Sequence, residues 1–187
     1  MLKFSSMGEI AKRRWILLFV AVITAIIQHT PGLNLKIGTL SPMLLVSFTV
    51  CVAMYERSIT GLFYGLVAGA LWDFASSGAD GMYTLMLTTI GFAVGIAVTL
   101  YVRNRLVSAL VLSLGSCTAV SVAYWLVFIL RKGYEGSWAL LFTHFLPLAV
   151  YSSVFVVVYY YLVGFIIKAT AVREESRLTY VRVYSSK

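Results

Sequence analysis

The sequence predicts an all-α integral membrane protein in which six transmembrane helices form one bundle. Three observations lead to this fold class: the apolar composition, six separate apolar runs, and the sorting of basic residues between those runs. Apolar residues make up 60% of the 187 residues and charged residues only 12%, which is outside the range of soluble domains. A chain of this length accommodates six spans of about 20 residues with short turns, and it leaves no room for a separate catalytic domain.

Apolar runs bounded by charged residues, Gly, Pro or Asn are the predicted spans. They cover residues 15–28, 39–55, 59–74, 82–102, 106–130 and 138–167. Only residues 56–58 separate the second run from the third, so these two helices should form a tight antiparallel pair. Residues 103–105 should do the same for the fourth and fifth runs. In the last run, Pro147 lies one turn after His144 and should kink the helix.

Three segments are expected along the chain: a cytoplasmic N-terminus (1–14), a six-span transmembrane domain (15–167) and a cytoplasmic C-terminal tail (168–187). The first apolar run follows Lys12, Arg13 and Arg14 as in a signal peptide, but no convincing cleavage site follows it, so we interpret it as a retained helix. The tail has no helical apolar stripe. We expect a disordered basic tail near anionic headgroups, and the alternative is a short strand that docks on a cytoplasmic partner.

Basic residues predict the orientation of the chain in the membrane. With six spans and the N-terminus inside, twelve of the fifteen Lys and Arg residues fall on the inner side: Lys3, Lys12, Arg13, Arg14, Arg57, Arg103, Arg105, Lys168, Arg173, Arg177, Arg182 and Lys187. The outer side has Lys36, Arg131 and Lys132. This bias places both termini in the cytoplasm. The net charge of +8 therefore follows from topology, and we expect no nucleic-acid binding because the basic residues flank apolar spans.

The third run contains a stripe of small residues. Gly61, Gly65 and Gly69 are spaced by four residues, which keeps them on one slanting face of a helix, and the fourth run has Gly91 and Gly95. Such a stripe allows the backbone of another helix to approach closely. We favour tight packing between helices of this chain; a smooth groove for a partner helix is the alternative.

Asp73 continues this stripe at the next four-residue step. An ionisable residue near the end of an apolar span is costly, and it is usually paired, solvated or functional. We expect Asp73 to cap the transition from helix to loop or to contact Ser76 and Ser77, with Gly78 and Gly81 shaping the turn.

No catalytic, cofactor or metal site is predicted. His29 and His144 lie in separate spans without the spacing of a metal motif, so they are interpreted as ordinary polar residues that share one end of the bundle with Asp73. Cys51 and Cys117 lie inside apolar runs and should be buried thiols. The sequence contains no nucleophile elbow, P-loop, dinucleotide fingerprint or paired carboxylates. An enzyme is therefore not expected.

One series of residues resembles a known family. It comprises Ser41-Pro42 at the start of the second run, Gly61, Gly65 and Gly69 leading to Leu71-Trp72-Asp73, the outer loop Ser77-Gly78-Ala79-Asp80-Gly81, and Gly91 in the next run. A proline before the second span, a glycine-rich third span ending in Leu-x-Asp and a glycine-containing outer loop are similar to the MreD family of rod shape-determining proteins. Pro147 in the last run also fits that family.

The resemblance implies a non-catalytic component of the elongasome in the bacterial cytoplasmic membrane. Such a protein binds MreC and helps to position the MreB filaments and the RodA glycosyltransferase with its transpeptidase partner for lateral cell-wall synthesis. The expected MreC contact comprises Gly61, Gly65, Gly69 and Asp73 together with Gly78 and Gly81 of the outer loop. Pro42, Gly91 and Pro147 are expected to be structural.

The resemblance also implies a fold like that of the substrate-binding components of energy-coupling factor transporters. A vitamin or metal transporter component of this kind is the alternative function. Ala21 and Ala25 imitate the small-residue pair by which such components contact their coupling subunit. A ligand pocket should, however, have a denser outer cluster of polar and aromatic residues than the sequence provides.

Overall fold

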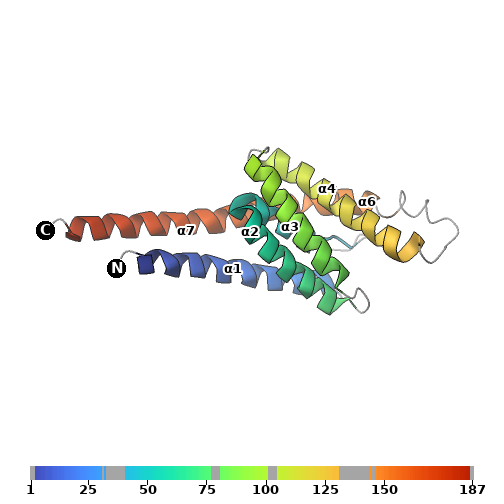
Figure 1. Ribbon diagram of the computed structural model, residues 1–187, viewed down its shortest axis with the longest axis horizontal. Coiled ribbons are helices and arrows are strands. Elements are labelled where there is room, and N and C mark those ends of the chain that lie inside the picture. Colours follow the sequence, from blue (N-terminus) through green and yellow to red (C-terminus); the bar gives the residue numbers. More distant parts are fainter. Residues whose placement is uncertain are drawn as a thin grey trace.

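The computed structural model describes residues 3–30, 32, 41–76, 81–100, 105–130, 144 and 146–185. They form the helices α1 (Lys3–His29), α2 (Leu44–Ala75), α3 (Met82–Leu100), α4 (Leu106–Tyr124), α6 (Leu146–Val154) and α7 (Val156–Ser185), and α4 continues into a π-helical segment, η1 (Trp125–Leu130). Figure 1 shows these helices packed into one bundle. The all-α prediction is confirmed for the described part of the chain.

Helix α2 joins the predicted second and third spans in one bent element. At Arg57 the backbone leaves the helical conformation, with φ 72° and ψ −172°, and the chain turns back. We call residues 44–56 the first arm and residues 58–75 the second arm. The arms are in close contact beside the bend, where a Cβ atom on Gly61 would lie 2.7 Å from the Ala53 Cβ atom.

The first arm runs antiparallel to α1. Its beginning contacts the C-terminal end of α1, where the Leu45 N–H donates a hydrogen bond to Gln28 Oε1 at 3.0 Å. Its end contacts the N-terminal half of α1, where Glu56 Oε1 lies 2.8 Å from Arg13 Nε. Every residue from Leu44 to Met54 is buried, so this arm is enclosed on all sides of its axis.

The second arm runs in the opposite direction to the first. Tyr64, near the bend, donates a hydrogen bond to the Arg14 carbonyl oxygen at 2.9 Å. Further along, the Trp72 ring lies 6.0 Å from the His29 ring, at the other end of α1. The tight antiparallel pair that the short 56–58 segment predicts is therefore present, inside α2.

The enclosed first arm is too short to cross a bilayer by itself. At about 1.5 Å per residue it is about 20 Å long, against about 30 Å for the hydrocarbon core. Helices α1, α4, α6 and α7 pack against α2, together with α3. The first arm thus lies at the centre of the bundle, and the other helices surround it.

The number of spanning helices differs from the prediction. Within the described residues, four helices are long and apolar enough to cross a membrane: Leu44–Ala75, Met82–Leu100, Leu106–Val127 and Leu146–Thr170. Helix α1 is not among them, because Lys12, Arg13 and Arg14 directly precede its apolar part, which is too short to qualify by itself. The prediction of six separate transmembrane helices is wrong, whereas that of a multi-pass membrane protein is confirmed.

Within the described residues, the last predicted span is divided at Phe155, between α6 and α7. Pro147 is the second residue of α6 as described. The residues directly before α6 lie outside the described part of the chain, so the kink at Pro147 stays a prediction. The Ser152 carbonyl oxygen accepts the Phe155 N–H at 3.2 Å and the Ser47 hydroxyl at 3.0 Å, so it is diverted from a regular helical hydrogen bond with Val156.

The C-terminal tail is helical in this structure. Helix α7 continues without interruption to Ser185, so the prediction of a disordered tail or a short strand is wrong. No Gly or Pro follows Gly164 in α7, and Ala, Arg and Glu residues that favour helix lie between residues 169 and 177. A helix that is already formed propagates into such a segment at little cost.

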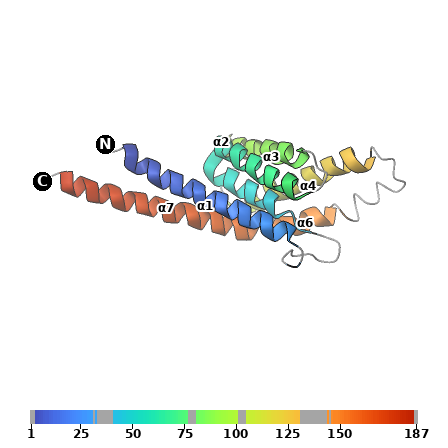
Figure 2. The same cartoon turned by 90° about the horizontal axis from the view of Figure 1, so that it is seen from below.

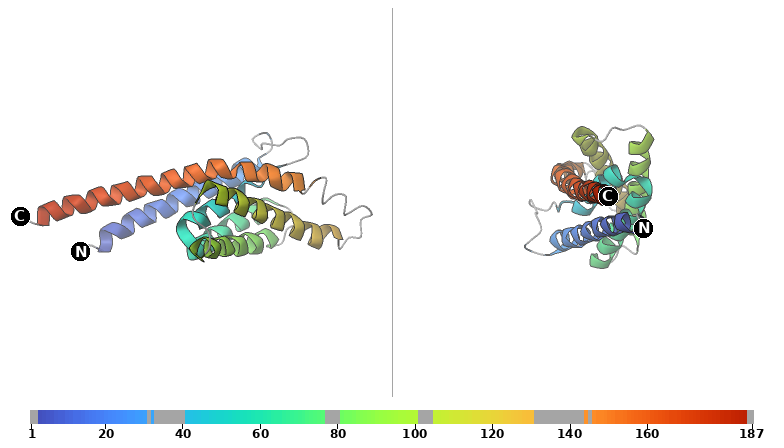
Figure 3. Two further views of the ribbon diagram at one scale, coloured as in Figure 1. Left: turned by 90° about the horizontal axis from the view of Figure 1, so that it is seen from above. Right: turned by 90° about the vertical axis from the view of Figure 1, so that its left-hand side faces the viewer.

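Both termini lie at the same end of the bundle. Figures 2 and 3 show the N-terminal part of α1 and the C-terminal part of α7 projecting beyond the bundle in the same direction. Basic residues of α1, α2 and α7, and one residue directly before α4, collect at this end beside the bend of α2: Lys12, Arg13, Arg14, Arg57, Lys168 and Arg105. We call it the basic end, and we call the opposite end, with Asp73 and His29, the distal end. The side of a membrane that each end faces stays a prediction.

Candidate functional site

The glycine stripe of α2 faces α3. A Cβ atom on Gly61 would lie 2.6 Å from the Gly91 carbonyl oxygen, and one on Gly69 would lie 2.7 Å from the Tyr83 carbonyl oxygen. Between them, a Cβ atom on Gly65 would lie 2.8 Å from the Leu87 carbonyl carbon. These separations are shorter than any real Cβ atom tolerates, so only glycine permits the observed distance between the two backbones.

Helix α3 contributes two glycines to the same contact. A Cβ atom on Gly91 would lie 2.8 Å from the Gly61 carbonyl carbon, and one on Gly95 would lie 2.8 Å from the Arg57 carbonyl carbon at the bend. We call Gly61, Gly65, Gly69, Gly91 and Gly95 the glycine seam. It is an interface within the chain, as the favoured interpretation of the sequence expects, and α3 occupies the face that a partner helix would have used.

Asp73 caps helix α3 from the end of the second arm. Its Oδ1 atom accepts the Tyr83 N–H at 3.2 Å, and its Oδ2 atom accepts the Thr84 N–H at 2.8 Å and the Thr84 hydroxyl at 2.5 Å. These N–H groups belong to the first turn of α3 and have no acceptor within the helix. A carboxylate is also favoured there by the helix dipole. Asp73 was expected to cap the end of its own helix, and in the structure it instead caps the start of the next helix, α3.

The two loop glycines differ in what the structure describes. Gly81 has φ +83°, a conformation that glycine adopts without strain, and its carbonyl oxygen accepts the Leu85 N–H at 3.1 Å at the start of α3. Gly81 therefore shapes the turn, as expected. Gly78 lies outside the described residues, and so does most of the outer loop.

The buried start of α2 depends on residues that sequence analysis did not single out. The Met43 N–H donates to Ser152 Oγ at 2.9 Å, and the Leu45 N–H donates to Gln28 Oε1. Inside a membrane such N–H groups have no water to bond, so side chains from other helices must accept them. Pro42, directly before this turn, is buried and brings no N–H of its own. The available signal in the sequence was a polar Gln28 or Ser152 at the end of, or within, an apolar run.

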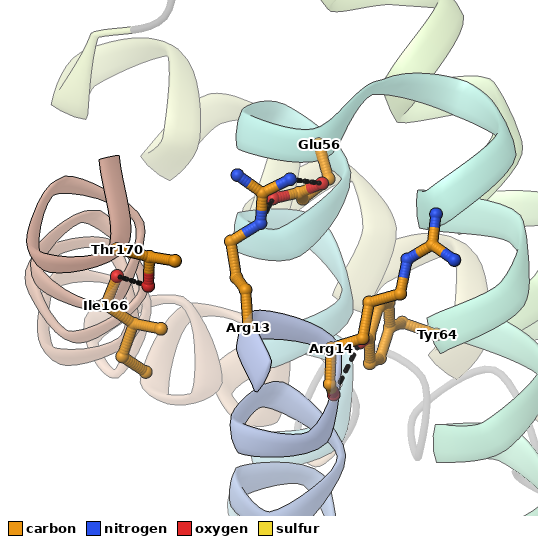
Figure 4. A network of polar contacts seen from close by, with 6 residues as sticks. All are labelled: Arg13, Arg14, Glu56, Tyr64, Ile166 and Thr170. Atoms are coloured by element: carbon orange, nitrogen blue, oxygen red, sulfur yellow. Dashed lines mark hydrogen bonds and ion pairs between the residues drawn. The ribbon is translucent and has the colours of Figure 1, made fainter. Parts of the chain in front are cut away.

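An ion pair holds α1 to the bend of α2 at the basic end. Arg13 Nη2 donates to Glu56 Oε2 at 3.2 Å, while Nε lies 2.8 Å from Oε1 without hydrogen-bond alignment. Figure 4 shows that the neighbouring Arg14 points away from Glu56 and lies alongside Tyr64. Adjacent arginines in the sequence thus have different surroundings.

Histidine and cysteine residues form no metal-binding group within the described residues. His29 makes an edge-on ring contact with Trp72. The Trp72 ring stacks on Tyr83 at a centroid distance of 4.4 Å, so this aromatic cluster packs the distal end around Asp73. Cys51 and Cys117 are buried and not in a disulfide, which confirms the expected buried thiols.

Ala21 and Ala25 are buried in the core of the bundle. The Ala21 side chain is fully enclosed, and that of Ala25 is 8% exposed. A small-residue pair that contacts a separate coupling subunit would have to lie on an outer face. The feature that imitates transporter components is therefore used inside this chain.

Comparison with known proteins agrees with these observations. The family model for rod shape-determining protein MreD matches residues 10–170, which includes α2, α3, the glycine seam and Asp73. No curated protein and no solved structure matches the chain, so the expected likeness to energy-coupling factor components finds no support. The match covers most of the chain, and the chain belongs to the MreD family of rod shape-determining membrane proteins.

Proposed function

We propose that this chain is a non-catalytic membrane component of the elongasome that binds MreC. In this role it supports MreB-directed lateral wall synthesis by RodA and its transpeptidase partner. The observation that carries the proposal is the family match over residues 10–170. The basic end is proposed to face the cytoplasm of a bacterial cell, because Lys and Arg are retained on that side of the membrane.

The hydrogen bonds and the ion pair made by the polar side chains support a scaffold role for this protein. Asp73, Gln28 and Ser152 all satisfy backbone N–H groups at helix starts, and Glu56 pairs with Arg13. Each of these groups thereby stabilises the bundle. A catalytic group instead needs to be directed at a substrate, with a neighbouring acid or base to activate it.

The MreC contact is proposed on the outer face of the α2–α3 pair. Gly65 and its neighbours are covered by α3, so they support the contact by holding the two helices together. The opposite side of the pair exposes Leu66 of α2 and Phe92 of α3, at 44% and 42%. A rigid two-helix surface of this kind suits a membrane helix of a bitopic partner, because it loses little conformational entropy on binding.

The test uses a rod-shaped bacterium that lacks its own MreD. The wild-type chain should restore the rod shape and should recover MreC when it is purified by an affinity tag. Failure of both readouts with a chain that is present in the membrane would refute the proposed function.

A pair of substitutions locates the contact. Leu66→Trp adds bulk to the outer face of α2 without adding polarity, and Val111→Trp makes a similar change on the outer face of α4, where Val111 is 65% exposed. We expect the first variant to lose MreC and the second to keep it. Equal recovery of MreC by both variants would refute the proposed face while leaving the function standing.

A further inference from the structure

A groove of about 720 Å³ lies between α1 and the second arm of α2, at the basic end. Helix α1 lines it with Arg14, Trp15 and Leu18, and α2 lines it with Ile59, Phe63 and Tyr64. This volume is in the range of sites that hold a ligand of roughly 300–1,000 Å³. The groove lies outside the glycine seam and the helix caps described above.

The walls of the groove are apolar. The side chains of Trp15, Ile59 and Phe63 are 72%, 82% and 51% exposed, so they are available to an occupant. Tyr64 contributes its ring and not its hydroxyl, because the hydroxyl is bonded to the Arg14 carbonyl oxygen and the residue is almost fully buried. An occupant must therefore be largely hydrocarbon.

One end of the groove carries the positively charged guanidinium group of Arg14. Arg14 is exposed, and among the side chains that the structure describes (residues 11–30, 32, 41–76, 81–100, 105–127, 144 and 146–170) no carboxylate pairs with its guanidinium, whereas Arg13 next to it is paired with Glu56. Figure 4 shows the Arg14 side chain on the Tyr64 side of α1, away from that carboxylate. A guanidinium group offers a fork of N–H donors that fits the oxygen atoms of a phosphate.

We infer that this groove binds one anionic phospholipid of the surrounding bilayer, with its phosphate on Arg14 and an acyl chain along Trp15 and Phe63. Charge complementarity favours an anionic headgroup, and the apolar walls require the chain. Trp15 is placed beside Arg14, at the level where tryptophan side chains meet the headgroups. A free phosphate ion would leave the walls uncovered. An apolar partner helix would leave the Arg14 charge desolvated and unpaired.

Lipid binding to the purified full-length protein tests the inference without any cell-shape readout. Native mass spectrometry in a neutral detergent should show one phosphatidylglycerol molecule bound at least tenfold more tightly than phosphatidylcholine. Arg14→Gln should lower the affinity for phosphatidylglycerol about tenfold, as expected for the loss of one charge-assisted contact. The fold should survive this change, because the Tyr64 hydrogen bond is to the Arg14 backbone.

Arg105→Gln is the matched control. Arg105 is also exposed and basic, but it precedes α4 and does not line the groove. The Arg105→Gln variant should bind phosphatidylglycerol with the affinity of the wild type. Equal losses in both variants would show a general charge effect, and no loss in either would show no role for Arg14; each result would overturn the inference.

Crosslinking in the membrane distinguishes the occupants. A photoreactive benzoylphenylalanine in place of Thr60, which lines the groove, should form adducts with phospholipid that Arg14→Gln reduces. The same group in place of Val111 on α4 should give lipid adducts that do not depend on Arg14. Adducts at position 60 that are mainly with another polypeptide would overturn the lipid assignment in favour of a partner helix.

Discussion

Replacing Gly65 by alanine should force α2 and α3 apart. The new Cβ atom would lie 2.8 Å from the Leu87 carbonyl carbon and 3.0 Å from Thr88 Cα, whereas carbon atoms pack best at about 3.5–4.0 Å. Backbone atoms cannot rotate away as a side chain does, so the helices must separate by about 0.5–1 Å along the seam. Overpacking of this kind costs about 1–3 kcal/mol.

The assay is the thermal midpoint of the purified protein in detergent, followed by size-exclusion chromatography of a fluorescent fusion. For a chain of this length about 2–4 °C is lost per kcal/mol, so Gly65→Ala should lower the midpoint by about 2–12 °C. Gly115→Ala is the matched control, because Gly115 is exposed on α4 and its Cβ atom would meet nothing within 4 Å. That control should be neutral or stabilising. Equal midpoints for the two variants would refute the close-packing argument.

Three further predictions use the same thermal assay. Asp73→Ala should lower the free energy of unfolding by about 1–2 kcal/mol, because two N–H groups of α3 lose their acceptor. Asp73→Asn should lower it less, because the amide oxygen still accepts a hydrogen bond. Equal losses in both variants would contradict the capping role. Arg57→Gly should be more stable than Arg57→Ala by about 1–3 kcal/mol, because only glycine relieves the strain at φ 72°. Both variants remove the same exposed side chain, so the comparison isolates the backbone effect. Equal stability would show that the bend is unstrained. Arg13→Gln and Glu56→Gln should be non-additive by about 0.5–3 kcal/mol in a double-mutant cycle, and additivity would exclude a stabilising ion pair.

Several features of the fold could be predicted because they depend on local properties of the chain. The apolar composition requires a membrane, and the short charged break at residues 56–58 requires the flanking helices to run antiparallel. The basic residues around Arg13 and Arg57 do lie together at one end. Counting spans failed because an apolar run of the first arm's length serves equally as a spanning helix or as a short helix enclosed by others.

The candidate site was predicted less completely. Asp73 could be recognised because a charge in an apolar run needs a partner, but the helix that it caps follows an intervening loop. Gln28 and Ser152 were missed because the N–H groups that they satisfy lie 17 and 109 residues away in the sequence. A polar residue signals a need for a partner without identifying that partner.

The sequence by itself determined that this protein lies in a membrane, that its basic residues gather on one side, and that the face of Gly61, Gly65 and Gly69 allows a backbone to come close. Composition, charge and helical spacing are properties of single segments, so they can be read without a fold. Only the tertiary structure decided that α3 fills the glycine face and that Arg13 pairs with Glu56 while Arg14 lies beside Tyr64. A small-residue face can pack against any helix, and an arginine can pair with any anion. The residues that the fold brings next to them therefore decide which contact forms.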